Sequence, residues 1–156
     1  MSATPRSPAG SLVPLSPEEE SVARAIGRLT QVLGRAMDAD LVREQRMSLS
    51  EYTVLRILSE HPERRMRMSE IANACDMSLS GMTRLAGRLE SHGFLLRVPC
   101  ESDARGANAV LTDAGLARLQ EAWPTHLASV RRHIFDHLDG LDLSTLTKAL
   151  TAMAES

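Results

Sequence analysis

The sequence predicts a mainly α-helical protein that carries one small β-hairpin. Three observations support this fold class. Apolar residues recur at spacings of three and four over most of the chain, which is the period of an amphipathic helix. Residues that favour helix N-termini precede several of these segments. Between residues 94 and 111 the pattern changes to two β-prone runs around a polar stretch, which is typical of a hairpin.

The first helix is expected to follow a flexible arm. Residues 1–15 contain three prolines and little periodicity, so they are expected to remain an arm without regular structure. Ser16 and Glu19 then have the spacing of a capping box, and Pro17 suits the first helical position. The apolar stripe that starts at Val22 predicts a helix that runs to about residue 44.

Three further helices are expected in the middle of the chain. Ser48 and Glu51 form a second capping-box pattern, which opens a helix that ends before Pro62. A polar loop containing three arginines follows. Ser69 and Ser78 are then expected to cap two short helices, joined by a turn at residues 76–77. Gly93 is expected to end the second of these short helices.

The hairpin and the C-terminal helices complete the expected order. Strands are predicted over residues 94–98 and 108–111, with a long polar tip over residues 99–107. Thr112 is expected to cap a helix whose apolar stripe reaches Leu141. Pro124 should kink that helix or split it. Residues 143–153 are expected to form the final helix.

Composition excludes several classes of protein. The chain has 156 residues, a formal charge of -2 and 3% aromatic residues, so it is not polybasic and its core must be aliphatic. Cys75 and Cys100 are too few for a disulfide framework or a four-cysteine zinc site. We expect Cys75 in the core and Cys100 exposed in the hairpin. The sequence contains neither a membrane-spanning apolar run nor a signal-peptide pattern, so a cytoplasmic location is expected.

Nothing in the sequence indicates an enzyme. It lacks a Gly-rich phosphate loop, a G-x-S-x-G elbow, a paired-carboxylate motif and H-E-x-x-H, so no catalytic residue and no cofactor are predicted. His133 and His137 have the spacing of a zinc pair, but no nearby cysteine or glutamate joins them. We therefore predict no metal site and interpret these histidines as residues at the edge of an interface.

Residues 69–112 carry the chemistry. Two short helices joined by a tight turn and followed by a hairpin form a winged helix-turn-helix, in which the second helix enters the major groove of double-stranded DNA and the hairpin, or wing, reaches a minor groove. The residues expected to face outward from that helix are of types that bind phosphates or base edges. They are Ser78, Ser80, Thr83, Arg84 and Arg88.

The wing carries a specific motif. Asp103-x-Arg105 followed by Leu111-Thr112-x-x-Gly115 resembles the wing signature of the MarR family of transcriptional regulators, and Thr83-Arg84-Leu85 with Arg88-Leu89-Glu90 is similar to that family's recognition helix. The resemblance implies that Arg105 inserts into a minor groove and that Asp103 braces it. A narrow minor groove has an enhanced negative potential, which suits a guanidinium. The resemblance also implies a homodimer held together by the terminal helices.

The expected organisation therefore has four parts. Residues 1–15 form the arm, residues 16–47 and 113–156 the dimerisation helices, and residues 48–112 the winged helix-turn-helix lobe. The apolar stripes of the terminal helices are more than one small helical layer can bury, which independently favours a homodimer.

The expected function is that of a sequence-specific DNA-binding regulator. As a homodimer it would repress transcription from a pseudo-palindromic operator. The resemblance further implies release by a small phenolic or other anionic ligand, although the sequence identifies no ligand-binding residues. A second interpretation stays open, in which the chain is a winged-helix protein–protein interaction module that does not bind DNA.

Overall fold

The computed structural model describes residues 12–156 and divides the chain into two compact units. The first unit ends at Leu33 and the second spans Gly34–Ser156, so the boundary falls inside the first helix. Most of the predicted arm lies outside the described residues. The elements, in chain order, are α1 (Pro17–Gln45), α2 (Leu49–Glu60), η1 (Pro62–Arg64), β1 (Arg65–Arg67), α3 (Met68–Ala74), α4 (Leu79–Ser91), β2 (Leu95–Cys100), β3 (Asp103–Leu111), α5 (Asp113–His133), η2 (Phe135–His137) and α6 (Leu143–Ala154).

The structure confirms a mainly helical fold with a hairpin wing. The predicted capping box at the start of α1 forms in full: Glu19 N–H donates to Ser16 Oγ at 3.2 Å, and Ser16 N–H donates to Glu19 Oε2 at 2.7 Å. The same reciprocal pair joins Ser48 and Glu51 at the start of α2. These short-range hydrogen bonds therefore define the residues at which α1 and α2 begin.

The first unit ends at residue 33, and the structure describes it from residue 12. Its described part is a short stretch without regular structure followed by the first half of α1. Val22, Leu29 and Val32 lie on this segment and are each about half exposed.

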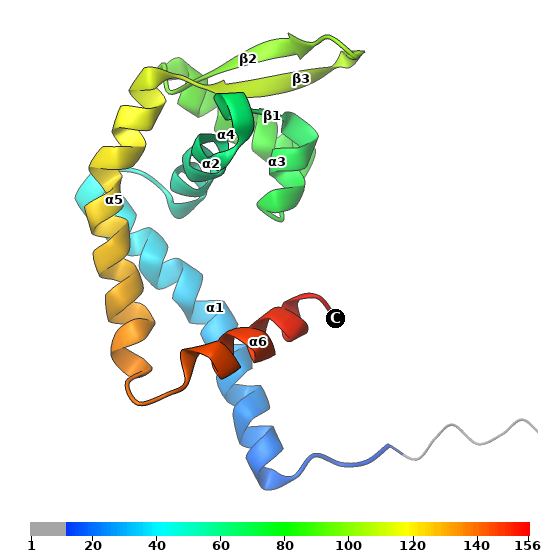
Figure 1. Cartoon of the computed structure of the whole chain (residues 1–156), viewed down its shortest axis with the longest axis vertical. Helices are drawn as coiled ribbons and strands as arrows, with labels where there is room; N and C mark the ends of the chain where they lie inside the picture. The colour runs from blue at the N-terminus through cyan, green and yellow to red at the C-terminus, as the bar shows by residue number, and fades with distance from the viewer. Residues whose placement is uncertain (1–11) are drawn as a thin grey trace, which may run out of the picture. The chain divides into compact units, whose positions relative to one another are not determined.

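The second unit contains the winged helix and its hydrophobic core. Figure 1 shows α2, α3 and α4 gathered beside the sheet, with the hairpin β2–β3 projecting beyond them. The sheet has three antiparallel strands in the order β1-β3-β2. The largest fully buried side chains come mainly from α1, α2, α3, α4 and β2, and include Leu41, Tyr52, Leu55, Leu58, Ile71, Met82, Leu85 and Leu95.

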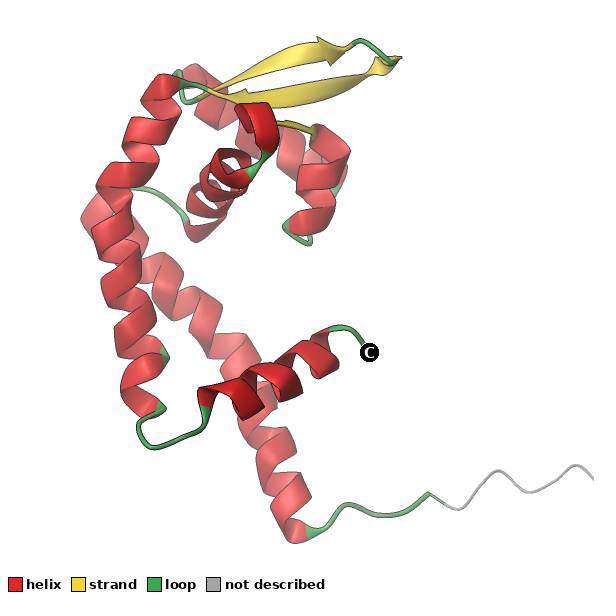
Figure 2. Cartoon of the chain, in the orientation of Figure 1, coloured by secondary structure: helices red, strands yellow, loops and turns green. Residues whose placement is uncertain are grey.

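Four local predictions are wrong. The loop after Pro62 contains a strand, β1, which the sequence could not reveal because three residues show no period. Ser69 does not cap α3, because the helix already begins at Met68. Strand β3 begins already at Asp103, where it pairs with Cys100, which leaves only residues 101–102 between the strands (Figure 2). The helix α5 is not split at Pro124, whose fixed φ is compatible with a helix, and it ends at His133, short of the predicted Leu141.

Helices α1 and α5 are joined in the second unit by a buried carboxylate. Asp40 is 5% exposed, and its Oδ1 accepts a hydrogen bond from Arg43 Nη2 at 2.6 Å. Its Oδ2 contacts Ser129 Oγ at 2.8 Å, His133 Nε2 at 2.9 Å and Arg132 Nη1 at 3.1 Å. The Arg43 guanidinium, and after it the Ser129 hydroxyl, hold the pKa of Asp40 well below its usual value. The ionised carboxylate therefore ties the end of α5 to α1.

The Asp40 contacts lead to a prediction about stability and pH. Asp40→Asn is expected to lower the free energy of unfolding at pH 7 by about 1–3 kcal/mol, because the buried Ser129 hydroxyl and three partly exposed donors lose a charged acceptor. Since folding lowers the pKa of Asp40, this stabilisation is complete above the unfolded value of 3.8 and is lost as the pH falls below it. Denaturant titrations at neutral and acidic pH should therefore show that the free energies of unfolding of variant and wild type differ less in acid.

The exposed Asp139 provides a matched control for this measurement. Asp139→Asn should leave the free energy of unfolding nearly unchanged at both pH values, because a solvated surface carboxylate contributes little. An Asp40→Asn gap that is as large in acid as at neutral pH would contradict the assigned role of the carboxylate.

Candidate DNA-binding surface

Helix α4 is positioned by a tight turn and a serine cap. Asp76 adopts a left-handed φ of 50°, which aspartate tolerates better than most residues, and so lets α4 follow α3 closely. Ser78 Oγ then accepts a hydrogen bond from Gly81 N–H at 3.1 Å. The inward side of α4 is fixed in the core by four buried residues: Met82, Leu85, Ala86 and Leu89.

The opposite side of α4 carries the side chains that the sequence singled out. Ser78, Ser80, Thr83, Arg84 and Arg88 are all exposed. The Thr83 hydroxyl donates to Leu79 O at 2.8 Å, and Arg88 Nε lies 3.5 Å from Glu51 Oε1. Arg84 takes part in none of the ion pairs found among residues 12–156. Its guanidinium is therefore available to a ligand on this side of the helix.

The wing places Arg105 on its exposed end. Arg105 follows the turn between β2 and β3, and its backbone N–H donates to Asp103 Oδ1 at 3.0 Å. The contact that the structure gives to Asp103 is thus with the backbone of Arg105 and leaves the guanidinium unconstrained by it. Arg97 of β2 pairs with Glu90 of α4, Nε to Oε2 at 2.7 Å, which ties the wing to the recognition helix.

Close packing explains why the wing signature has glycine at position 115. A Cβ on Gly115 would lie 2.0 Å from the carbonyl oxygen of Phe94, so no other residue fits without moving the backbone. Thr112 completes the junction, because its hydroxyl donates to Gly93 O at 2.6 Å and accepts from Gly115 N–H at 3.0 Å. The signature therefore fastens the start of α5 to the point where α4 ends and the wing begins.

The wing and α4 share a hollow of about 320 Å³. Thr83 and Leu79 contribute from α4, Arg97, Asp103 and Arg105 from the wing, and Arg67 from β1. Arg97 is paired with Glu90, but the guanidiniums of Arg67 and Arg105 outnumber the single carboxylate that lines the hollow, so it is electropositive and suits a phosphate-rich ligand. Sequence reasoning missed Arg67 and Arg97, because nothing in their local pattern shows that they reach this place.

Cys100 is buried at the end of β2, contrary to the expectation that it is exposed. It is 8% exposed, because its thiol lies under the turn, where it is 3.2 Å from Ser102 Oγ and 3.3 Å from Arg67 Nη2. The Ser102 hydroxyl, followed by the Arg67 guanidinium, lowers the pKa of the Cys100 thiol to about 7. Burial instead raises the pKa of Cys75, which packs against the core as expected.

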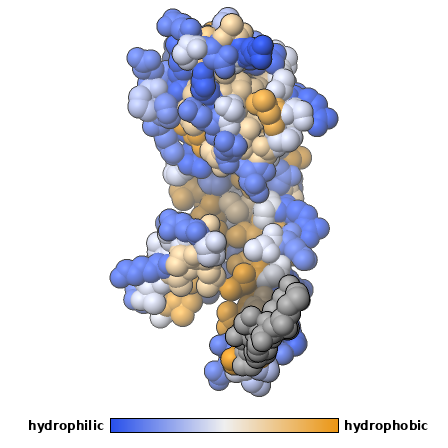
Figure 3. All heavy atoms as spheres, turned by 90° about the vertical axis from the view of Figure 1, so that its right-hand side faces the viewer, coloured by the Kyte–Doolittle hydropathy of each residue, from blue (hydrophilic) through white to orange (hydrophobic). Residues whose placement is uncertain are grey.

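No helix among residues 12–156 is long and apolar enough to span a membrane. In the space-filling view, the face of the winged-helix lobe that is turned to the viewer is mainly hydrophilic (Figure 3). A lobe with a polar surface, an exposed recognition helix and an arginine-tipped wing defines the class of the protein: it is a winged-helix DNA-binding transcriptional regulator.

Comparison with known proteins gives the family. The model of the MarR family matches residues 47–106. The HTH-type transcriptional regulator PecS of Dickeya dadantii (strain 3937) is 30% identical over 118 residues, which cover 75% of this chain and 70% of PecS. The chain therefore belongs to the MarR family, whose members are transcriptional regulators and not enzymes.

Solved structures agree over nearly the whole chain. AbsC, a MarR-family regulator from Streptomyces coelicolor, is 37% identical with a TM-score of 0.81, and the match covers 92% of this chain and 97% of AbsC. Sco3205 from the same organism, whose crystal structure is a complex with DNA, is 33% identical with a TM-score of 0.84 and coverages of 94% and 92%. The likeness therefore includes the helices on both sides of the winged helix.

Proposed function

We propose that this regulator binds a pseudo-palindromic duplex as a homodimer, with α4 of each protomer in a major groove and Arg105 in the adjacent minor groove. The observation that carries the proposal is that Thr83, from the exposed row of α4, and the arginine of the wing line one electropositive hollow. A helix fits the major groove, and an arginine is favoured in a narrow minor groove. The DNA complex of Sco3205 supports the same use of this fold.

Repression follows from the same geometry. A dimer that occupies two successive major grooves covers about one helical turn between the centres of its half-sites. If that site overlaps a promoter, the bound protein excludes RNA polymerase sterically. We therefore propose that the protein acts as a repressor.

The proposed DNA contacts can be tested by a mobility-shift assay with a duplex from the gene's own upstream region. Arg105→Ala and Arg84→Ala are each expected to weaken binding by about 1–3 kcal/mol, since each removes a guanidinium from a groove. Wild-type affinity should fall steeply with salt, because phosphate contacts release counterions.

Arg131→Ala is the matched control, because it removes an equal charge from an exposed position on α5. Its affinity should match that of the wild type. If Arg84→Ala and Arg105→Ala also bind as well as the wild type, or if no fragment is retarded at low salt, the proposal fails. The protein–protein interaction module would then be the better interpretation.

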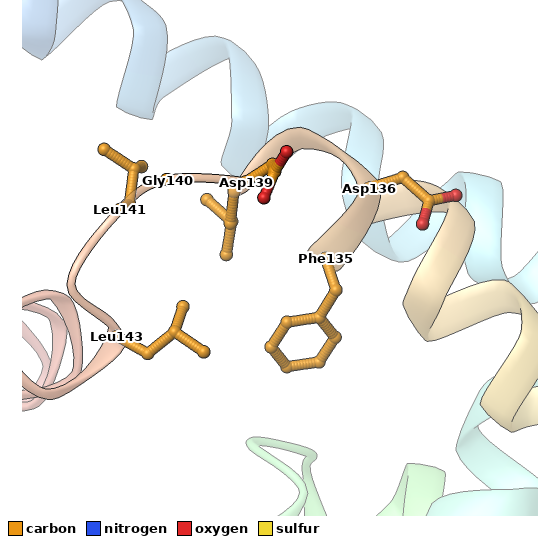
Figure 4. Close-up of a pocket in the computed structure, with 7 residues that line it drawn as sticks. Phe135, Asp136, Asp139, Gly140, Leu141 and Leu143 are labelled. Carbon is orange, nitrogen blue, oxygen red and sulfur yellow. The ribbon is translucent and has the colours of Figure 1, made fainter.

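Exposed apolar side chains around α6 support the homodimer. Figure 4 shows Phe135 and Leu143 on opposite sides of a hollow in the α5–α6 connection, while Asp136 points away from it. Phe135, Leu143, Leu150 and Met153 are each about half exposed, and α6 buries no residue in the single chain. An apolar helix face of this kind is stable in water when a second copy covers it.

The homodimer can be tested by sedimentation velocity. The wild type should sediment with twice the chain mass of 17.1 kDa, and Leu150→Glu should shift the equilibrium toward the monomer because it buries a charge in the interface. Leu96→Glu changes an equally exposed leucine on the wing and should leave the dimer intact. A wild type that sediments as a monomer at micromolar concentration would contradict the proposal.

We also propose release from DNA by a small phenolic or other anionic ligand. Two buried polar atoms support a site where α2 meets α5: Tyr52 Oη and His126 Nδ1 lack a hydrogen-bond partner among the described residues. Their rings stack with centroids 4.3 Å apart, and the ring centroid of Trp123 lies 6.2 Å from that of His126. Salicylate added to the mobility-shift assay should release the duplex and change the fluorescence of Trp123, the only tryptophan. An unchanged complex and fluorescence would count against a phenolic ligand.

A further inference from the structure

Arg67 joins the helix-turn-helix to the far end of the wing. It is the last residue of β1, where it pairs with Asn108 of β3, and it directly precedes α3. Its side chain is half-buried, and its Nη2 donates to Ser102 Oγ at 3.2 Å and to Cys100 Sγ at 3.3 Å. A single guanidinium therefore connects the start of α3 with residues that are 33 and 35 positions away.

The acceptors of Arg67 border the turn that leads to Arg105. The strand register shifts between Pro99 and Cys100, and only residues 101–102 separate the two strands. Asp103 follows at once, and its carboxylate accepts the backbone N–H of Arg105 at 3.0 Å. Residues 101–105 are exposed, so buried side chains do not hold this end of the wing. Hydrogen bonds from Arg67 thus hold the turn from which Arg105 extends.

The side-chain acceptors of Arg67 are a hydroxyl and a thiol, not carboxylates. Arg97, in the same hollow, is paired with the Glu90 carboxylate, which cancels its charge locally. Arg67 instead donates to a hydroxyl and a thiol, and none of the ion pairs among the described residues includes it. It can therefore order the turn without adding a second carboxylate to that of Asp103 beside Arg105.

We propose that Arg67 is a positioning residue for DNA binding, which fixes the turn at residues 101–102 and thereby orients Arg105 toward the minor groove. This inference rests on the proposed DNA contact of Arg105. It differs from a direct contact of Arg67 with phosphate, because a positioning residue acts only through the residue that it positions.

A double-mutant cycle on the upstream duplex separates the two roles. Arg67→Met is expected to weaken binding about tenfold, which is within the range for the loss of one groove contact. In the Arg105→Ala background the same substitution should change the affinity by less than about twofold, because Arg105 is no longer there to be oriented. Equal effects of Arg67→Met in both backgrounds would overturn the proposal and indicate a direct contact.

Two further variants define the chemistry. Ser102→Ala should weaken binding in the wild-type background and have no added effect on Arg67→Met. Arg67→Lys keeps the charge, but its side chain is one bond shorter than the reach of Arg67 Nη2, which makes both hydrogen bonds, so it should not restore affinity. Restoration by lysine would overturn the proposal, because charge alone would then suffice.

Arg65→Met is the matched control: it removes an equal charge from the same strand, and any effect it has should be the same with and without Arg105.

A measurement without DNA shows whether the contact exists in solution. In a Cys75→Ala background the ultraviolet absorbance of the remaining thiolate reports on Cys100. Its pKa should be about 7 and should rise in Arg67→Met, because the thiolate loses a hydrogen-bond donor and a nearby positive charge. An unchanged titration would overturn the proposed contact. Failure of the wild type and of every variant to bind the duplex, with this titration as expected, would instead refute the proposed function.

Discussion

The approach of α5 to the wing is so close that position 115 has no room for a side chain. Gly115 lies against the carbonyl of Phe94. The Thr112 hydroxyl donates a hydrogen bond to the carbonyl oxygen of Gly93, which follows the end of α4. The end of α4, both long strands of the wing and the start of α5 therefore meet within a few residues. Because this close packing leaves little free space, a movement of the start of α5 would displace the wing and the end of α4 with it.

Helix α5 connects this junction, at its start, with a buried ionic cluster near its end. At its start α5 is attached to the wing and the end of α4, the part of the molecule that we propose faces DNA. Near its end, Ser129, Arg132 and His133 meet the buried carboxylate of Asp40 in α1. Between them, Tyr52 and His126 stack where α2 meets α5. A ligand or a second protomer that moves α5 would therefore change the position of the wing, which is a physical route for coupling between distant sites.

Much of this account could be predicted from the sequence, because its main signals are local. Capping boxes at Ser16 and Ser48 and the cap at Thr112 are short-range hydrogen bonds, and the structure contains all three. The family follows from the wing signature. The strand β1, the burial of Cys100 and the place of Arg67 could not be predicted, since each depends on pairing between segments more than 30 residues apart. Such contacts leave no period or spacing in the sequence.

The central claim is that Arg105 reads the minor groove while α4 reads the major groove, and modified bases test it most directly. Diaminopurine in place of adenine adds an amino group to the minor groove only, whereas a purine that lacks N7 alters the major groove only. Diaminopurine in the sequences flanking each half-site should weaken binding of the wild type and leave the already weaker binding of Arg105→Ala unchanged. If the wild type tolerates diaminopurine at every position and responds only to the loss of N7, Arg105 does not act in the minor groove.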